Sequence, residues 1–138
     1  MTKIRLHKEV FEANEGFYQA FESLDIKLMD RVWAQDDRVQ CVHPGWGGLT
    51  GWPSVRDSWV RIFNHTLFIK FTVSDLHISG DEGVAWVVCT ENIETQAEEP
   101  SQKSRILATN IFEKRNDLWK MVHHHGSPVL TNPSISST

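Results

Sequence analysis

The sequence predicts an α+β fold in which helices come first and an antiparallel sheet follows, in the order α-α-β-α-β-β-β-β. Three observations support this class. Apolar residues recur at helical spacing in the first half of the chain, to about residue 65. From Leu67 onward the apolar period changes to two, and turn-forming residues separate the successive runs. A long curved sheet wrapped over helices should leave a cone with a cavity inside.

The bulk composition is that of an ordinary globular protein. The chain has 138 residues, of which 40% are hydrophobic and 23% charged, so we expect one domain over residues 1–128 and a C-terminal tail over 129–138. The net charge of −4 disfavours binding to nucleic-acid phosphates. No apolar run is long enough to span a membrane, and the N-terminus lacks the apolar core of a signal peptide. These features predict a cytoplasmic protein with no nucleic-acid or membrane partner.

Cysteine and tryptophan positions give two further expectations. Cys41 and Cys89 lie inside apolar runs, so we expect buried, reduced thiols, with a disulfide between them as the alternative. Trp46, Trp52 and Trp59 fall close together in the chain. Aromatic surface concentrated in this way suits either a ligand cavity or a subunit interface.

The first two helices are predicted from apolar spacing and caps. Val10, Phe17 and Phe21 define a helix over about Lys8–Ser23. Asn14 falls inside that stripe, where it is either satisfied at the helix surface or lines a cavity. Ser23 is expected to cap a second helix that stops near Gln35.

The middle of the chain alternates strand, loop and helix. A short strand over Arg38–Val42 ends at His43-Pro44, and a glycine-rich loop over residues 45–51 follows. This loop lacks the Gly-Lys-Ser/Thr ending of a phosphate loop. Pro53 is well placed near the start of a third helix that runs to about His65.

Four strands complete the chain. The apolar side changes parity between Val73 and Leu76, which predicts a β-bulge or bend near Ser74-Asp75. A turn is expected over residues 80–83, a strand from Val84 to about Gln96 and a loop over residues 97–102. A further strand over Arg105–Glu113 leads into the final hairpin.

The final hairpin, over residues 108–127, is expected to turn at Asn116 and Asp117. A two-residue turn sets the register, pairing residues 115 with 118, 113 with 120, 112 with 121, 111 with 122, 110 with 123 and 108 with 125. Asn110, His123 and His125 should then share one face with an apolar base, while His124 points the other way. Three polar groups in a row are more typical of a pocket than of a core.

The opposite face of this hairpin is too apolar to remain in contact with water. We therefore expect a homodimer packed through that face, which carries the side chains of Leu107, Thr109, Ile111 and Val122.

With these elements in place, the chain resembles the SnoaL-like branch of the nuclear transport factor 2-like (NTF2-like) superfamily, which has a cystatin-like α+β cone. The matching stretches are residues 41–46, 51–59, 90–93, 108–112 and 119–127. The His-Pro loop and the final Trp…His-x-His strand are also similar to the association domain of calcium/calmodulin-dependent protein kinases. That domain has a basic pocket for small carboxylates, but Asn110 stands where its pocket has an arginine. Arg105 could compensate if its side chain turns inward.

The resemblance implies a fold and a cavity rather than one activity. Relatives include polyketide cyclases, ketosteroid isomerases, dehydratases, epoxide hydrolases and non-catalytic assembly domains. The enzymes among them generally use an Asp or His in the cone as acid or base, with no metal or organic cofactor.

The candidate site residues leave several alternatives open. His123 and His125 could act in acid–base chemistry, form hydrogen bonds in the pocket or core, or bind a metal with His43 or Glu91 as third ligand. Glu91 is a general base with a raised pKa if its strand face points inward, and a surface acid otherwise. Trp46 and Trp59 either contact a ligand or belong to the core or an interface.

Two functions follow from these alternatives. The first is a cofactor-free isomerase, cyclase or dehydratase that acts on a small hydrophobic or carbonyl-bearing molecule. Its acid–base residues would be His43, Glu91 and His123 or His125, and Asn110 would hold the substrate oxygen. The residues expected to contact substrate are Trp46, Trp59, Asn110, Arg105 and Asn14. The second function is a non-catalytic ligand-binding or oligomerisation module.

Overall fold

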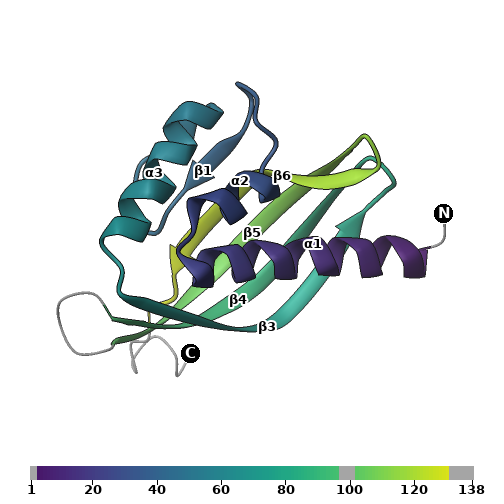
Figure 1. Ribbon diagram of the computed structural model, residues 1–138. Helices are drawn as coiled ribbons and strands as arrows, with labels where there is room; N and C mark the ends of the chain where they lie inside the picture. The colour runs from purple at the N-terminus through teal and green to yellow at the C-terminus, as the bar shows by residue number, and fades with distance from the viewer. Residues whose placement is uncertain (1–2, 97–101, 131–138) are drawn as a thin grey trace.

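The computed structural model describes residues 3–96 and 102–130, and within them three helices cover one face of a six-stranded sheet (Figure 1). The sheet order is β2-β1-β6-β5-β4-β3, and only the β1–β6 pair is parallel. This confirms the predicted α+β class, with one strand more than expected. Of the loop predicted over residues 97–102, residues 97–101 lie outside the described residues, and Gln102 belongs to a strand instead; the tail beyond residue 130 also lies outside them. The elements are α1 Lys3–Ser23, α2 Ile26–Val32, β1 Gln40–Val42, β2 Leu49–Thr50, α3 Trp52–Asn64, β3 Phe68–Gly80, β4 Val84–Gln96, β5 Gln102–Arg115 and β6 Leu118–Pro128.

Helix α1 lies along the sheet and supplies one wall of the interior (Figure 1). It begins at Lys3, earlier than the predicted Lys8. Asn14 belongs to its buried stripe, together with Val10 and Phe17. The alternative in which Asn14 is satisfied at the helix surface is therefore wrong.

The cap of α2 differs from the prediction by two positions. Asp25 is the N-cap, because its carboxylate accepts the backbone N–H of Lys27 at 2.9 Å. Ser23 instead donates its hydroxyl to the carbonyl of Ala20 at the end of α1 and accepts the backbone N–H of Asp25 at 3.1 Å. Helix α2 stops at Val32, short of the predicted Gln35.

Strand β2 was not expected, because it lies within the glycine-rich loop. It pairs with β1 through Gln40–Thr50 and Cys41–Leu49. Gly51 follows β2 and directly precedes the first turn of α3. Its φ of 90° is a backbone conformation that favours glycine. Pro53 lies in that first turn, as predicted.

The predicted bulge in β3 is confirmed. The register of β3 against β4 shifts between Ser74 and His77, and Asp75 adopts φ of 52°. The apolar residues on both sides of the shift therefore contact the same core.

The β5–β6 hairpin follows the predicted register only in its first half. Asn116 and Asp117 form the turn with φ of 51° and 65°, and the pairs from Arg115–Leu118 to Phe112–Met121 are as expected. The register then shifts by one residue, so that Asn110 pairs with His124 and no longer with His123. The extra residue of this β-bulge is Val122.

This bulge reverses the faces of the three consecutive histidines. His124 is 2% exposed and points into the cone, whereas His125 is exposed on the outer face of the sheet and His123 is half-buried there. The predicted inward orientation of His123 and His125 is wrong because it assumed unbroken alternation. Val122 packs partly against the core, so its predicted place on the outer face is also wrong.

The outer face of the sheet keeps the apolar character predicted for it. Leu107 is 47% exposed and Trp86 is 43% exposed, and Thr109 and Ile111 are partly buried beside them. Cys41 and Cys89 are buried and unbonded to each other, which confirms the expectation of free thiols. No helix within the described ranges is long and apolar enough to cross a membrane.

Candidate functional site

The centre of the cone contains a hydrogen-bonded cluster that starts at His124 on β6. His124 Nδ1 donates to Asn110 Oδ1 on β5 at 2.5 Å. The amide nitrogen of Asn110 donates to Asn14 Oδ1 at 2.8 Å and to the Tyr18 hydroxyl at 3.2 Å, both on α1. All four residues are buried. Helix α1 and the β5–β6 hairpin, which are far apart in the sequence, therefore meet at one polar cluster.

The cluster continues to a buried carboxyl group on β4. The Tyr18 hydroxyl donates to Glu91 Oε2 at 2.5 Å, and Glu91 is almost fully buried. Burial raises the pKa of Glu91 to about 7, although the hydrogen bond from Tyr18 acts in the opposite direction. Burial and the nearby carboxylate also raise the pKa of Tyr18, which stays a neutral donor. Glu91 can therefore both hold and release a proton near neutral pH.

His43 forms a second buried cluster at the end of β1. The Ser58 hydroxyl donates to the carbonyl of Val55 at 2.6 Å, so it accepts the Nε2–H of His43 at 2.9 Å. The thiol of Cys41 lies 3.5 Å from the same nitrogen. Burial, with a further effect of the Arg61 charge, lowers the pKa of His43 to about 4. His43 is thus a neutral imidazole held in place by α3.

Trp59 on α3 lies between the two clusters. Its ring centroid is 4.7 Å from that of His43 and 6.0 Å from that of His124. Its indole Nε1–H is fully buried and has no hydrogen-bond partner within the described residues. Buried donors without an acceptor are rare in native proteins. The site therefore contains one donor that a ligand oxygen or a water molecule could satisfy.

The hydrogen bonds also fix the proton positions on His124. The amide nitrogen of Asn110 is committed to donation, so its oxygen accepts and His124 Nδ1 carries the hydrogen. Burial keeps the pKa of His124 well below its usual value, and the neighbouring His43 acts in the same direction. The remaining nitrogen, Nε2, is unprotonated and makes no hydrogen bond within the described chain. This arrangement leaves a neutral imidazole whose tautomer is set by an amide and whose Nε2 can accept a hydrogen bond.

The structure brings together five of the residues proposed for the site and separates the others. His43, Glu91, Trp59, Asn110 and Asn14 all lie in the interior.

The remaining candidates lie elsewhere. His123, His125 and Arg105 are on the outer face, so Arg105 does not turn inward. Trp46 is 39% exposed and stacks edge-on against His43, with a centroid distance of 4.9 Å. It separates His43 from solvent.

Sequence reasoning missed two central residues. His124 was assigned to the outer face because the bulge at Val122 has no marker in the sequence. Tyr18 was not among the expected site residues, although its hydroxyl joins Asn110 to Glu91. A buried Tyr next to a buried Asn one turn away would have been the available signal.

The metal alternative finds no support in the site geometry. No cluster of three or more potential ligands occurs among residues 3–96 and 102–130. The expected third ligands, His43 and Glu91, lie on the opposite side of the sheet from His123 and His125.

The fold is that of the NTF2-like superfamily. An NTF2-like protein from Salmonella enterica has the same architecture, with a TM-score of 0.85 over 95% of this chain and 96% of that one, at 14% identity. Residues 10–131 match the SnoaL-like domain. The chain therefore belongs to the SnoaL-like family, as its motifs indicated.

Two solved structures are also similar in sequence. A candidate dehydratase of the NTF2-like family from Streptomyces avermitilis is 36% identical, with a TM-score of 0.88 over 94% of this chain and all of that one. A candidate calcium/calmodulin-dependent protein kinase type II association domain from Thiobacillus denitrificans is 33% identical, with a TM-score of 0.77 over 86% of this chain and 93% of that one.

A curated plant protein shares the domain. The F-box protein SKIP8 from Arabidopsis thaliana is 28% identical over 123 residues, which are 89% of this chain. Those residues are 51% of the plant protein, so the chain spans about half the length of that relative.

Proposed function

We propose that the chain is a small-molecule-binding SnoaL-like protein that transfers protons inside the cone without a cofactor, as an isomerase, cyclase or dehydratase. The observation that carries this proposal is the buried cluster in which Asn110 fixes the tautomer of His124 and leaves Nε2 free. The similarity to a candidate dehydratase agrees with it. The substrate is a hydrophobic molecule with a carbonyl group, because the interior walls are aromatic and contain no Lys or Arg side chain among the described buried residues.

Each interior group has a role in this mechanism. His124 Nε2 takes a proton from the carbon next to the substrate carbonyl and later returns it to another position. The Trp59 Nε1–H donates to the carbonyl oxygen as negative charge develops there. Glu91, when ionised, stabilises the imidazolium of His124 through the field of the low-dielectric interior. His43 and Ser58 hold the wall that carries Trp59.

Substrate must pass a covering residue to reach this cluster. Trp46 lies in the loop after β1, packs against His43 and has Arg61 over its ring at 5.3 Å. Movement of this loop would open a route from solvent to His43 and Trp59. Trp46 is thus assigned to access, and Trp59 to contact with the ligand oxygen.

Deuterium exchange tests the proposed chemistry. The α-protons of 2-tetralone, a hydrophobic ketone, are followed by NMR in D₂O with the purified chain. We expect His124→Ala to reduce the protein-dependent exchange rate by about 100-fold, the lower end of general-base effects. His125→Ala, which removes the neighbouring imidazole on the outer face, should exchange at the wild-type rate. Equal rates in wild type and His124→Ala would contradict the assignment.

The second candidate function is an oligomerisation module. Exposure of Leu107 and Trp86 on the outer face of the sheet favours it, as does similarity to a candidate association domain. In this function the sheet face forms a homodimer, and the interior cluster serves only to specify the fold. A homodimer is also compatible with the enzyme.

A further inference from the structure

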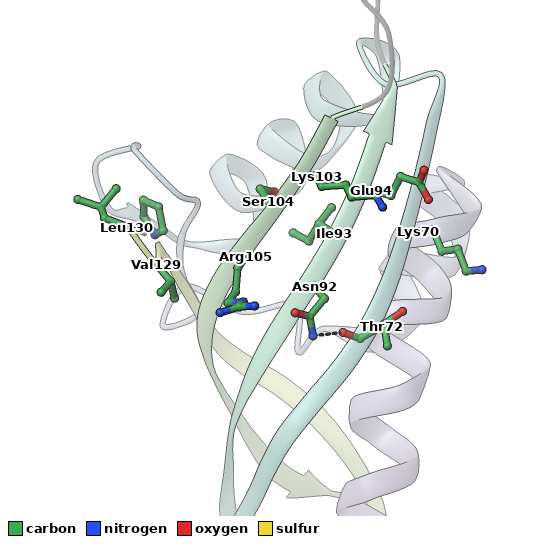
Figure 2. A pocket seen from close by; sticks show the side chains of 11 residues that line it. Lys70, Thr72, Asn92, Ile93, Glu94, Lys103, Ser104, Arg105, Val129 and Leu130 are labelled. Atoms are coloured by element: carbon green, nitrogen blue, oxygen red, sulfur yellow. Dashed lines mark hydrogen bonds between the residues drawn. The ribbon is translucent and has the colours of Figure 1, made fainter. Parts of the chain in front are cut away.

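A groove of about 800 Å³ lies on the outer face of the sheet, on the side opposite the interior cluster, and Figure 2 shows the residues that line it. It is formed by β3, β4, β5, the last residue of β6 and the two residues that follow it. Its lining combines cationic, polar and apolar side chains: Lys70, Thr72, Asn92, Ile93, Glu94, Lys103, Ser104, Arg105, Pro128, Val129 and Leu130. This volume is in the range of small-molecule sites.

Two rows of cross-strand neighbours set the charge of the groove. In the row nearer the end of β4, Glu94 is paired in register with Lys70 on β3 and with Lys103 on β5. One carboxylate thus faces two ammonium groups across the sheet. In the next row along the same face, Asn92 is paired in register with Arg105, and this row contains no carboxylate. The groove therefore has a surplus of positive charge, although the whole chain is acidic.

Arg105 is the cation best placed for a ligand. Its guanidinium makes no ion pair or hydrogen bond within residues 3–96 and 102–130. Its register partner Asn92 is oriented by donation of its amide nitrogen to the carbonyl of Thr72 at 2.8 Å and to the hydroxyl of Ser74 at 2.9 Å, and makes no hydrogen bond to Arg105 within the described residues. Figure 2 shows the Arg105 side chain between Asn92 on one side and Val129 on the other.

The opposite wall of the groove is apolar and held by the backbone. The N–H of Val129 donates to the carbonyl of Arg105 at 2.9 Å, which extends the β5–β6 pairing beyond β6. Val129 and Leu130 are both exposed, the latter strongly. A guanidinium fork therefore lies directly beside apolar surface that is exposed in the single chain.

We propose that this groove binds a small organic carboxylate with an apolar tail. A guanidinium matches one carboxylate in a bidentate geometry, and the tail would cover Val129 and Leu130. A single negative charge fits better than a dianion, because Glu94 offsets part of the lysine charge. The site is separate from the proposed catalytic cluster: Glu91 and Asn92 are consecutive on β4 and point to opposite faces of the sheet.

Calorimetric titration of octanoate into the full chain tests this site, with 1-octanol as the uncharged comparison. We expect octanoate to bind at least about ten-fold more tightly than octanol, since hydrogen bonds to charged groups are worth more than neutral ones. Arg105→Gln should weaken the affinity for octanoate by about the same factor and leave the affinity for octanol unchanged. Arg105→Lys keeps the charge but not the fork, and should give an intermediate affinity.

Lys27→Gln is the matched control, because it removes one exposed positive charge on α2. It should leave octanoate affinity within about two-fold of wild type, as expected for a distant surface charge. Amide chemical shifts locate the ligand, with changes expected at Asn92, Arg105 and Val129. No binding of octanoate, equal affinity for octanol, full affinity of Arg105→Gln, or shifts centred on Asn110 and His124 would each overturn the proposal.

Discussion

His124 and His125 are neighbours in the sequence and occupy opposite environments. His124 lies among Phe17, Trp59 and Asn110, with its Nδ1–H donated to an amide oxygen. His125 is exposed on the other side of the sheet. The same side chain thus has a structural and proposed chemical role at one position and neither at the next. This contrast supplies a matched pair of variants.

The first prediction concerns stability. His124→Ala leaves Asn110 Oδ1 buried without its donor and removes ring contacts, so we expect a loss of about 2 kcal/mol or more in the free energy of unfolding. His125→Ala should change that free energy by less than about 0.5 kcal/mol, as is usual for exposed positions. Urea unfolding followed by tryptophan fluorescence measures both values. A cost for His125→Ala as large as that for His124→Ala would contradict the inward orientation of His124.

The second prediction concerns pH. Because the pKa of Glu91 is raised to about 7 in the folded chain, the folded state binds more protons than the unfolded state between about pH 4.3 and 7. The stabilisation that results from the raised pKa of Glu91 is complete below the unfolded pKa and is lost as the pH rises through 7. Glu91→Gln should therefore become more stable relative to wild type as pH rises across that interval.

The measurement is the difference in unfolding free energy between Glu91→Gln and wild type at several pH values from 4 to 8. His43 and His124 give pH dependence of the opposite sign, since burial lowers the pKa of each, but they are common to both proteins and cancel in the difference. A difference that does not change with pH would show that Glu91 titrates normally.

At the scale of the element, the final hairpin shows how far the alternation of side chains between the two faces of a strand can be predicted from the sequence. The turn at Asn116-Asp117 and the pairs up to Phe112–Met121 are predictable, because two-residue turns set register locally. The shift at Val122 is not predictable in this way, because the apolar parity of the sequence does not change there and nothing marks the extra residue. The bulge in β3 could be predicted, since there the apolar parity itself changes in the sequence.

The same contrast, between features marked in the sequence and features set by tertiary contacts, explains which site residues could be predicted. Glu91, Asn110 and Asn14 could be proposed because each interrupts an apolar pattern. The sequence left the face of Glu91 open, and the structure places it inward. His124 required knowledge of the bulge, and Tyr18 required knowledge of which α1 residue meets β4. Both depend on contacts between segments far apart in the chain.

The third prediction concerns the hairpin turn. Asn116 and Asp117 both adopt positive φ, which costs a non-glycine residue free energy that glycine avoids. We expect Asp117→Gly to stabilise the chain by about 0.5–1 kcal/mol, because Asn-Gly is the preferred pair for this turn. Thermal unfolding measures the gain.

The control uses the same substitution in the neighbouring hairpin. Asp81 Oδ1 accepts the backbone N–H groups of Gly83 and Val84 at 2.9 and 3.1 Å, so Asp81→Gly should destabilise. Stabilisation by both substitutions would contradict the explanation from the positive φ of Asp117, because the extra freedom of glycine in the unfolded chain by itself lowers stability.

At the scale of the whole molecule, the sheet has two chemically different faces. The inner face meets the helices and carries the polar cluster. The outer face carries Leu107 and Trp86 in exposed positions together with Thr109 and Ile111. Exposed apolar surface of this kind is typical of protein contacts, which is why a homodimer remains our proposal for this face.

The fourth prediction tests that dimer. Sedimentation velocity at micromolar concentration should give a dimer for the wild type and a monomer for Leu107→Glu, because a charge at an apolar interface is costly to desolvate. Leu118→Glu, at an exposed position beside the hairpin turn, should stay dimeric. A monomeric wild type would exclude the interface.

The bulge at Val122 has a consequence for comparing this chain with its relatives. It behaves as a one-residue insertion, so that every later residue faces the side that unbroken alternation would give to its neighbour. A relative with an unbulged strand would place its inward residue one position earlier, so an alignment without a gap there would match His123 to it. Placing the gap at Val122 assigns the inward histidine correctly, and functional residues can then be transferred between relatives along this strand.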